Sequence, residues 1–158
     1  MADRASDPRP GTRRMERVLV LHGPNLNLLG EREPEIYGAL TLEEIDGRIA
    51  EHAGRLGVTT RSVQSNVEGE LVREIQDART WADGILINAA GYSHTSVAVR
   101  DALAAVPVPA VAVHLSNPAA REQFRHVDVV AGACRGVVAG FGWRSYVLAL
   151  EALVDANP

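Results

Sequence analysis

β-branched or apolar runs alternate with longer amphipathic stretches along most of this chain. The runs cover residues 17–22, 58–65, 84–88, 109–114 and 127–131. Most of them lack the strict alternation of polar and apolar residues that marks a strand with one face in water. Each run is therefore predicted to be a strand whose two faces are both covered by other elements.

The stretches between these runs have apolar residues at helical spacing. Residues 41–57 show the pattern most clearly, because Thr41 and Glu44 have the spacing of a capping box and Gly57 stands at the other end. Further helices are predicted over residues 68–81, 95–105, 119–125 and 141–155. Strands separated by helices indicate an α/β fold, a flavodoxin-like doubly wound sheet of five parallel strands in the order 2-1-3-4-5, with helices on both faces.

The length and charge of the chain narrow the classes of protein to which it can belong. Its 158 residues suffice for one compact domain, which we place at residues 15–158, after a disordered lead-in at residues 1–14. The formal net charge of −4 is spread along the chain, unlike the basic surface of a nucleic-acid-binding protein. No apolar run reaches the roughly 18 residues of a membrane span, and the lead-in lacks the apolar core of a secretory signal. We expect a cytoplasmic protein that binds neither nucleic acid nor membranes.

The residue types present exclude several kinds of chemistry. All 16 basic residues are arginine, so the chain can form neither a Schiff base with lysine nor a lysine-containing phosphate loop. Cys134 is the single cysteine, which excludes an internal disulfide and a Cys-x-x-Cys metal site. The histidines lack the close spacing of a zinc site, so no metal is expected. Any catalysis has to come from His, Tyr, Arg, Asn, carboxylate or hydroxyl groups.

Polar residues follow three of the predicted strands. Asn25 comes after the first strand, and Asn88 and then His94 come at the end of the third. His114 ends the fourth strand. In an open α/β sheet, ligands bind at the carboxyl ends of the strands beside the point where the strand order reverses, here between strands one and three. A loop asparagine is often only a turn former, but the coincidence of these residues at one edge favours a binding site.

Residues 30–38 form a long predicted loop after the first strand, and such loops are often lids. Taken alone, Tyr37 is a packing residue and Arg32 a solvated charge. The functional alternative is a tyrosine base. A tyrosine has an ordinary pKa near 10, but a cation about 4 Å away favours the phenolate by roughly 4 kcal/mol at an effective dielectric constant of 20. Arg32 is the candidate cation nearest in sequence.

Further groups are candidates for holding an anionic substrate. Arg121 and Arg125 are four residues apart on a predicted helix, so they form either an anion clamp or part of a solvated face. The backbone N–H groups of Leu115 and Ser116 lie between a strand and a helix, where they can receive a carboxylate. Asp101 is either a surface charge or a group that holds a hydroxyl or orients a histidine.

Five segments of the chain together resemble one enzyme family. They are HGPNLNLLGEREPEIYG, QSNVEGELV, NAAGYSHTSVAVRDAL, VHLSNPAAREQFR and GFGWRSYVLAL. In order and spacing, from Val18 to Leu153, they closely resemble the type II 3-dehydroquinate dehydratases. The resemblance implies a flavodoxin-like fold without metal or cofactor, assembled as a homo-oligomeric dodecamer of four trimers. It also implies dehydration of 3-dehydroquinate to 3-dehydroshikimate, in the shikimate pathway of aromatic amino acid biosynthesis or in quinate breakdown.

The resemblance implies a role for each candidate residue. Tyr37 is then the proton acceptor, whose phenolate Arg32 keeps charged. His114 is the proton donor, and Asn25 holds the water that stabilises an enolate. The substrate-binding groups are Asn88, His94, Asp101, Arg125 and the Leu115–Ser116 backbone. In the family, the residue that matches Asp101 reaches the site of a neighbouring subunit, and Arg121 matches an arginine on the lid side of the pocket.

The chain departs from the family pattern close to the expected site. The family usually has a glutamate that orients or polarises the proton donor, whereas this chain has Ala112, so weaker protonation of the leaving group is expected. His22 stands in place of a usual asparagine, and Val127–Asp128 in place of His-Ser. These changes leave a second substrate open, 5-amino-5-deoxy-3-dehydroquinate of the aminoshikimate pathways.

Other classes of function share the predicted fold. A flavin- or nucleotide-binding module is disfavoured, because Pro24 stands in the turn after the first strand, where a phosphate-binding loop needs N–H donors. A phosphate receiver needs an aspartate where Asn88 stands and a lysine that the chain lacks. A catalytically silent subunit of an assembly stays open because of the substitutions near the site.

Overall fold

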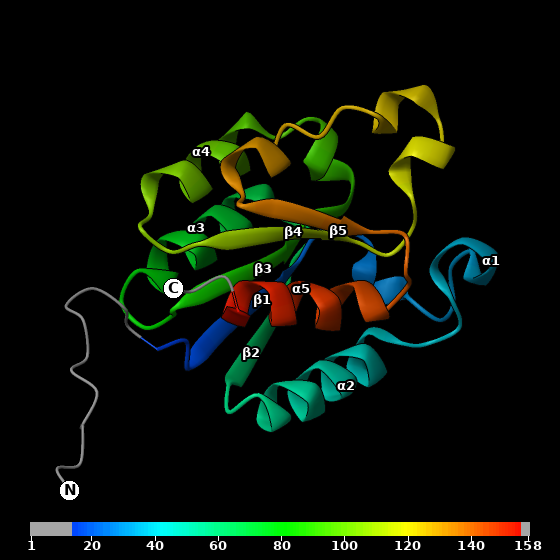
Figure 1. The fold of residues 1–158 in the computed structure, drawn as a ribbon. Coiled ribbons are helices and arrows are strands. Elements are labelled where there is room, and N and C mark those ends of the chain that lie inside the picture. Colours follow the sequence, from blue (N-terminus) through cyan, green and yellow to red (C-terminus); the bar gives the residue numbers. More distant parts are fainter. Residues whose placement is uncertain (1–13, 156–158) are drawn as a thin grey trace, which may run out of the picture.

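The computed structural model describes residues 14–155, so the predicted lead-in lies almost wholly outside the described residues. Five strands form one sheet: β1 (Arg17–His22), β2 (Thr59–Gln64), β3 (Gly84–Asn88), β4 (Ala110–His114) and β5 (Gly136–Ala139). All are parallel and follow the order β2-β1-β3-β4-β5 (Figure 1). The predicted flavodoxin-like, doubly wound topology is confirmed.

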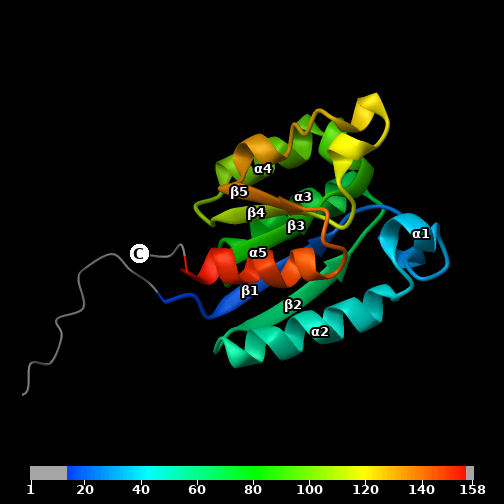
Figure 2. The same ribbon diagram turned by 45° about the vertical axis from the view of Figure 1, so that its right-hand side comes forward.

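Longer helices cover both faces of the sheet. They are α2 (Leu42–Arg55), α3 (Glu68–Ala78), α4 (Val97–Ala105) and α5 (Arg144–Asp155). α2 and α5 lie on one face, and α3 and α4 on the other (Figures 1 and 2). Along β1, Val18 and Val20 pack against the first pair of helices, whereas Leu19 and Leu21 pack against the second. Because both faces are covered, the strand is apolar at successive positions.

The start of α2 follows directly from its sequence. The Thr41 hydroxyl accepts a hydrogen bond from the Glu44 N–H at 3.2 Å, and the Glu44 carboxylate accepts one from the Thr41 N–H at 2.8 Å. This is the capping box predicted from the spacing of the two residues. Ile45 and Ile49 follow on the buried face, which fixes how the helix lies on the sheet.

The fifth strand lies later in the chain than predicted. Residues 127–131 form no strand, although their composition is typical of one. The Asp128 carboxylate accepts a hydrogen bond from the Ala131 N–H at 2.9 Å, and the Val129 N–H donates to the Ser93 carbonyl at 2.8 Å. These bonds turn the chain into a short 3₁₀ helix, Ala131–Ala133, and use donors that a strand would give to its neighbour.

Two other predicted segments differ in detail. The helix expected at residues 119–125 is a pair of 3₁₀ turns, Pro118–Ala120 and Gln123–Arg125, separated at Arg121, whose backbone is extended. The loop at residues 30–38, which we call the lid, contains one helical turn, α1 (Pro34–Tyr37). That turn begins at a proline, whose ring presets the helical backbone angle. Tyr37 is its last residue and is therefore held by local backbone structure.

Gly23 lies where the end of β1 passes very close to the chain that leaves β3. Its N–H donates to the Asn88 carbonyl at 2.7 Å, and an added Cβ atom would be 2.4 Å from the Ala89 carbonyl oxygen. We expect Gly23→Ala to lower the free energy of unfolding by about 2–3 kcal/mol, because backbone atoms have to move apart. Urea unfolding followed by circular dichroism measures the loss. The control is Gly47→Ala in α2, which has open space and is expected to stabilise slightly; equal losses in both would contradict this account.

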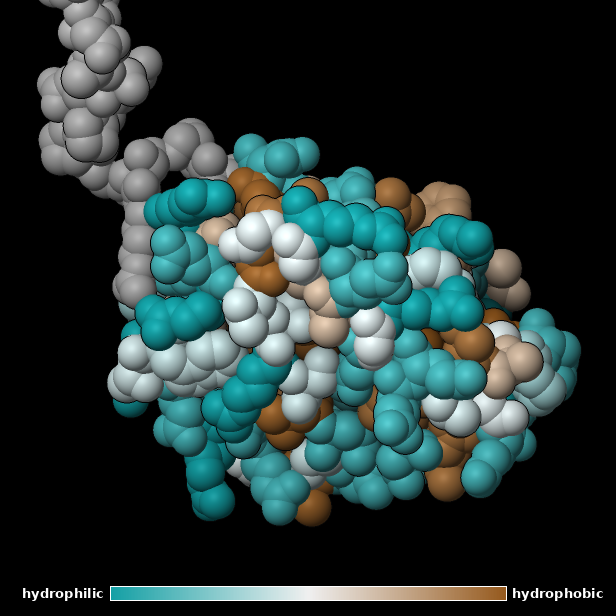
Figure 3. Space-filling view, turned by 90° about the horizontal axis from the view of Figure 1, so that it is seen from below, coloured by the Kyte–Doolittle hydropathy of each residue, from teal (hydrophilic) through white to brown (hydrophobic). Residues whose placement is uncertain are grey.

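The surface seen from below, on the side of α2, is mostly hydrophilic (Figure 3). Hydrophobic residues form small, separate patches there, as is usual for a helix-covered face turned to water. Within residues 14–155, none of the helices is long and apolar enough to cross a membrane.

Candidate active site

The carboxyl ends of β1, β3 and β4 meet at one edge of the sheet. His22 and Asn88 are register partners at the ends of β1 and β3, and His114 is the last residue of β4. A cavity of about 140 Å³ lies at these ends. Nine of the ten residues predicted for the site line it, namely Asn25, Arg32, Tyr37, Asn88, His94, His114, Leu115, Ser116 and Arg125.

Asp101 is the predicted site residue that does not line this cavity in its own chain. It lies exposed on α4 and forms an ion pair with Arg100 at 3.3 Å. Its expected role in the site of a neighbouring subunit concerns a second copy of the chain and stays a prediction.

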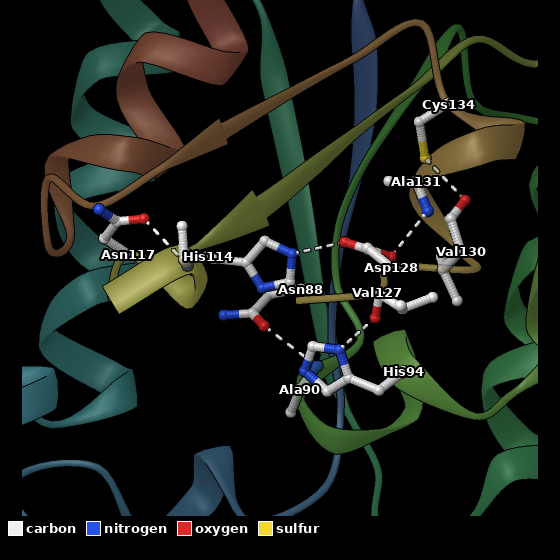
Figure 4. Close-up of polar contacts among 11 residues, drawn as sticks. Asn88, Ala90, His94, His114, Asn117, Val127, Asp128, Val130, Ala131 and Cys134 are labelled. Carbon is white, nitrogen blue, oxygen red and sulfur yellow. Dashed lines mark hydrogen bonds and ion pairs between the residues drawn. The ribbon is translucent and has the colours of Figure 1, made fainter. Parts of the chain in front are cut away.

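A buried chain of hydrogen bonds fixes the Asn88 amide. Asn88 Oδ1 accepts from the Ala90 N–H at 3.1 Å (Figure 4), and Nδ2 donates to the Tyr146 hydroxyl at 3.2 Å. The Tyr146 oxygen lies 2.8 Å from His22 Nδ1, and His22 Nε2 lies 2.8 Å from Asp46. Burial raises the pKa of Tyr146, so this group is a neutral hydroxyl that donates to His22. His22 in turn donates to Asp46, and the pocket amide is held in one orientation.

His114 lies between a carboxylate and a second imidazole ring (Figure 4). Its Nε2 is 2.7 Å from Asp128 Oδ2, and its ring stacks on that of His94 with centroids 6.5 Å apart. Burial raises the pKa of Asp128, but hydrogen bonds from His114 and the Ala131 N–H, with the nearby histidines, outweigh it and place this pKa below its ordinary value of 3.8. Asp128 is therefore ionised at neutral pH.

Tyr37 lies close to two arginine side chains at the lid. Arg32 Cζ is 5.4 Å from the centroid of the tyrosine ring, and Arg121 Cζ is 5.1 Å from it. At these distances each guanidinium interacts with the negative face of the ring. A wider groove of about 920 Å³ adjoins the cavity, and Tyr37 and Arg121 belong to the lining of both. The tyrosine therefore stands at the boundary between the enclosed cavity and the open surface.

Arg121 and Arg125 both reach the cavity, although they do not share a helical face as predicted. The Arg121 guanidinium lies 3.3 Å from the Ser116 hydroxyl, and Arg125 Nε pairs with Glu122 at 2.6 Å. Both side chains are largely buried, with 13% and 20% of their surface exposed. Together with Arg32 they make the cavity positive, which suits an anionic ligand.

Two cavity residues have left-handed backbone angles. Asn25 has φ 68° and Ala90 has φ 51°. Asparagine tolerates this region, whereas alanine pays about 1–2 kcal/mol, which the hydrogen bond from the Ala90 N–H to Asn88 helps to offset. The Asn25 backbone N–H donates to Asn66 at 2.9 Å, and its side-chain amide has no hydrogen-bond partner within residues 14–155. That amide is free to bind a ligand or a water.

The described part of the chain contains no group of three His, Cys, Asp or Glu side chains placed to hold a metal ion. The two cavity histidines each have one nitrogen engaged, His94 Nδ1 with the Val127 carbonyl at 2.7 Å and His114 Nε2 with Asp128. Each ring thus has one nitrogen left for a small molecule.

Sequence reasoning alone does not find Asp46, Tyr146 or Asp128 as supports of the site. Asp46 and Tyr146 lie within predicted helices, where nothing in the pattern marks them as partners of a strand residue. The sequence around Asp128 does offer a clue, because a single carboxylate inside an apolar run is unusual unless it is exposed or paired.

The family to which this chain belongs follows from comparison with known proteins. A sequence model described as "Dehydroquinase class II" matches residues 16–154. The chain belongs to the class II dehydroquinase family. A 3-dehydroquinate dehydratase of Acaryochloris marina is 57% identical over 137 residues, which cover 87% of this chain and 92% of the relative. A 3-dehydroquinate dehydratase of Caldanaerobacter subterraneus is 50% identical over 139 residues, which cover 88% of this chain and 94% of the relative.

Solved structures of class II dehydroquinases have the same fold. A type II dehydroquinase from Butyrivibrio crossotus superposes with a TM-score of 0.86 at 40% identity, covering 88% of this chain and 97% of the other. One from Propionibacterium acnes gives the same TM-score and identity, covering 90% and 99%. The resemblance drawn from the five sequence segments is confirmed, as is the five-stranded topology expected of the family.

Proposed function

We propose that this chain catalyses the dehydration of 3-dehydroquinate to 3-dehydroshikimate, the hydro-lyase reaction of the shikimate pathway. One observation carries the proposal: a single cavity is lined by Tyr37, with guanidinium groups close to its ring, and by His114, beside a carboxylate. A candidate base and a candidate acid thus share one small-molecule site. Membership of the class II dehydroquinase family supports the same reaction.

The base is Tyr37, acting as a phenolate. A proton next to a ketone is only moderately acidic, so its removal needs a strong base and stabilisation of the enolate that forms. Arg32 and Arg121 lie close enough to the ring to favour the phenolate by Coulomb attraction. The phenolate oxygen takes the C2 proton, and the electron pair of the C–H bond moves toward the ketone oxygen.

Two further cavity residues, Asn25 and His114, act on the enolate and on the leaving group. The unpaired Asn25 amide holds a water that donates a hydrogen bond to the enolate oxygen. When the enolate collapses, the C1–O bond breaks on the opposite face from the lost proton. His114 gives a proton to the departing hydroxyl, so the products are the conjugated ketone and water.

Arg125 is proposed to bind the substrate carboxylate, with help from the Leu115 and Ser116 backbone. We expect Arg125→Ala to raise KM about 10- to 100-fold and to change kcat much less, because one charge-assisted contact is lost. Steady-state kinetics on 3-dehydroquinate measure both constants. The control is Arg55→Ala, which removes an exposed arginine on α2 paired only with Glu51 among the described residues. A loss confined to kcat would argue against the carboxylate contact.

The reaction itself is tested by mixing purified protein with 3-dehydroquinate and following the increase in enone absorbance. Turnover that is lost when Tyr37 is replaced by phenylalanine supports the proposal. Absence of turnover by the unaltered chain refutes it. The same assay with 5-amino-5-deoxy-3-dehydroquinate ranks the two substrates by kcat/KM. We expect 3-dehydroquinate to be preferred, because His114 retains a carboxylate partner despite Ala112.

A homo-oligomeric state is proposed as well, a cytoplasmic dodecamer of four trimers. It is supported by exposed apolar side chains: Val137 on the edge strand β5 is 51% exposed, and Phe124 and Val127, earlier in the chain, are 66% and 63% exposed. Asp101, exposed on α4, is the residue proposed to enter a neighbouring site. Light scattering after size-exclusion chromatography should give about twelve times the 16.9 kDa of one chain. A monomeric mass with full activity would contradict both points.

A further inference from the structure

The segment that carries Asp128 is fastened to the turn that carries His94. The Val127 carbonyl accepts from His94 Nδ1–H at 2.7 Å, and the Val129 N–H donates to the Ser93 carbonyl at 2.8 Å. Val130 is 1% exposed and packs in the core beneath α4. One carboxylate oxygen of Asp128 accepts from the Ala131 N–H, and the other faces His114 (Figure 4). Contacts on both sides therefore fix the carboxylate relative to the imidazole.

Most charged groups around His114 are positive. Two hollows include this histidine in their lining, the cavity described above and a smaller one beside β5. Their other titratable or charged members are Arg32, Arg121, Arg125, Tyr37, His94, His126 and Asp128. Asp128 is the one acidic residue among these lining residues of the described chain. Arg32, Arg121 and Arg125 each have a glutamate partner outside this lining, Glu33 or Glu122, whereas Asp128 is the carboxylate that contacts His114 directly.

The strand that carries His114 does not supply a carboxylate itself. Ala112 lies two positions earlier and on the same side of β4, but it offers only a buried methyl group. The carboxylate comes instead from residue 128, fourteen positions further along the chain, and contacts Nε2 at 2.7 Å. The side chains are 10% and 21% exposed, so water screens the pair only weakly.

We propose that Asp128 is a positioning residue that holds the proton donor His114 in one ring orientation and one tautomer. This inference rests on the proposed dehydration. Asp128 accepts from Nε2–H, and Nδ1 has no hydrogen-bond partner within residues 14–155. Nδ1–H is then the bond that breaks as the proton passes to the leaving hydroxyl, while Nε2–H stays in place. Before the next turnover the proton that Tyr37 took from C2 passes by way of water to the neutral ring, so that both groups return to their starting states.

The kinetic test compares Asp128→Asn with the unaltered enzyme. Asparagine keeps the oxygen that caps the Ala131 N–H but removes the charge. We expect kcat to fall about 10- to 100-fold at neutral pH with KM changed less than about threefold, since proton transfer is weakened and binding is not. Asp77→Asn, at an exposed position on α3, is the matched control and should leave kcat and KM unchanged.

An NMR experiment tests the effect of Asp128 on the His114 ring in the absence of turnover. In ¹⁵N-labelled unaltered protein, His114 should show protonated Nε2 and unprotonated Nδ1 once its ring is neutral. In Asp128→Asn, where a neutral amide replaces the carboxylate acceptor, the preference for this tautomer should weaken and both tautomers should be populated. A neutral ring with the proton on Nδ1 in the unaltered protein, or an unchanged tautomer and unchanged kcat in the variant, overturns the proposal. Absence of dehydration in the unaltered protein would instead refute the proposed function, because the tautomer can be read without substrate.

Discussion

Replacing Tyr37 by phenylalanine is expected to reduce kcat by at least about 10³-fold while leaving KM within a few-fold of its original value. The variant keeps the ring that packs near Arg32 and Arg121 and removes only the oxygen that we propose takes the C2 proton. A general base contributes about 10²–10⁴-fold, and no other cavity residue can supply a comparably strong one. Steady-state assay of enone formation gives kcat, and calorimetric titration with 3-dehydroquinate gives binding.

The matched control is Tyr92→Phe. The Tyr92 hydroxyl donates to the Asn66 carbonyl at 3.0 Å and does not line the cavity. This variant loses one exposed hydrogen bond and should retain kcat within about threefold. If Tyr37→Phe turned over at a similar rate to the control, the phenolate mechanism would have to be abandoned.

Replacing His114 by glutamine should have an effect of similar size on elimination and a different effect on proton exchange. Glutamine cannot donate a proton to the leaving hydroxyl, so we expect kcat to fall about 10²–10⁴-fold. Tyr37, the proposed base, is intact in this variant, and we expect it still to form the enolate. In D₂O, deuterium should therefore enter at C2 of 3-dehydroquinate faster than product appears, which NMR of the substrate detects.

His52→Gln is the control for that experiment. His52 pairs with Glu151 at 2.7 Å between α2 and α5, away from the cavity, and an amide can keep one hydrogen bond there. The His52→Gln variant should catalyse the elimination of water at the normal rate. Loss of both exchange and elimination in His114→Gln would show that this histidine acts before the enolate forms, contrary to its proposed role.

The fold could be read from the sequence wherever local and long-range requirements agree. Runs such as 17–22 and 84–88 are apolar because helices cover both faces, and their order along the chain was enough to give the topology. The segment at 127–131 was misplaced because its composition fits a strand equally well. Its real conformation depends on bonds to Ser93, His94 and Ala131, and bonds to distant residues leave no periodicity in the sequence.

The candidate site was predictable for a different reason. Asn88 and His114 stand at strand ends, and the parallel topology brings such ends together whatever the loops do. The supports of these residues were not predictable in this way. Tyr146 reaches Asn88 across 58 positions, and Asp128 reaches His114 from a loop, so each depends on packing that only the folded chain defines.

The bonds from Asn88 through Tyr146 and His22 to Asp46 end on the outer helix α2, where the aspartate is 28% exposed. The orientation of the buried Asn88 amide therefore depends on a residue at the surface of the molecule. Replacing this aspartate on α2 is expected to change the hydrogen bonds of His22 and Tyr146 and, through them, the orientation of the Asn88 amide that lines the cavity. Evolutionary drift and protein engineering on that helix face therefore have less freedom than its contact with water suggests.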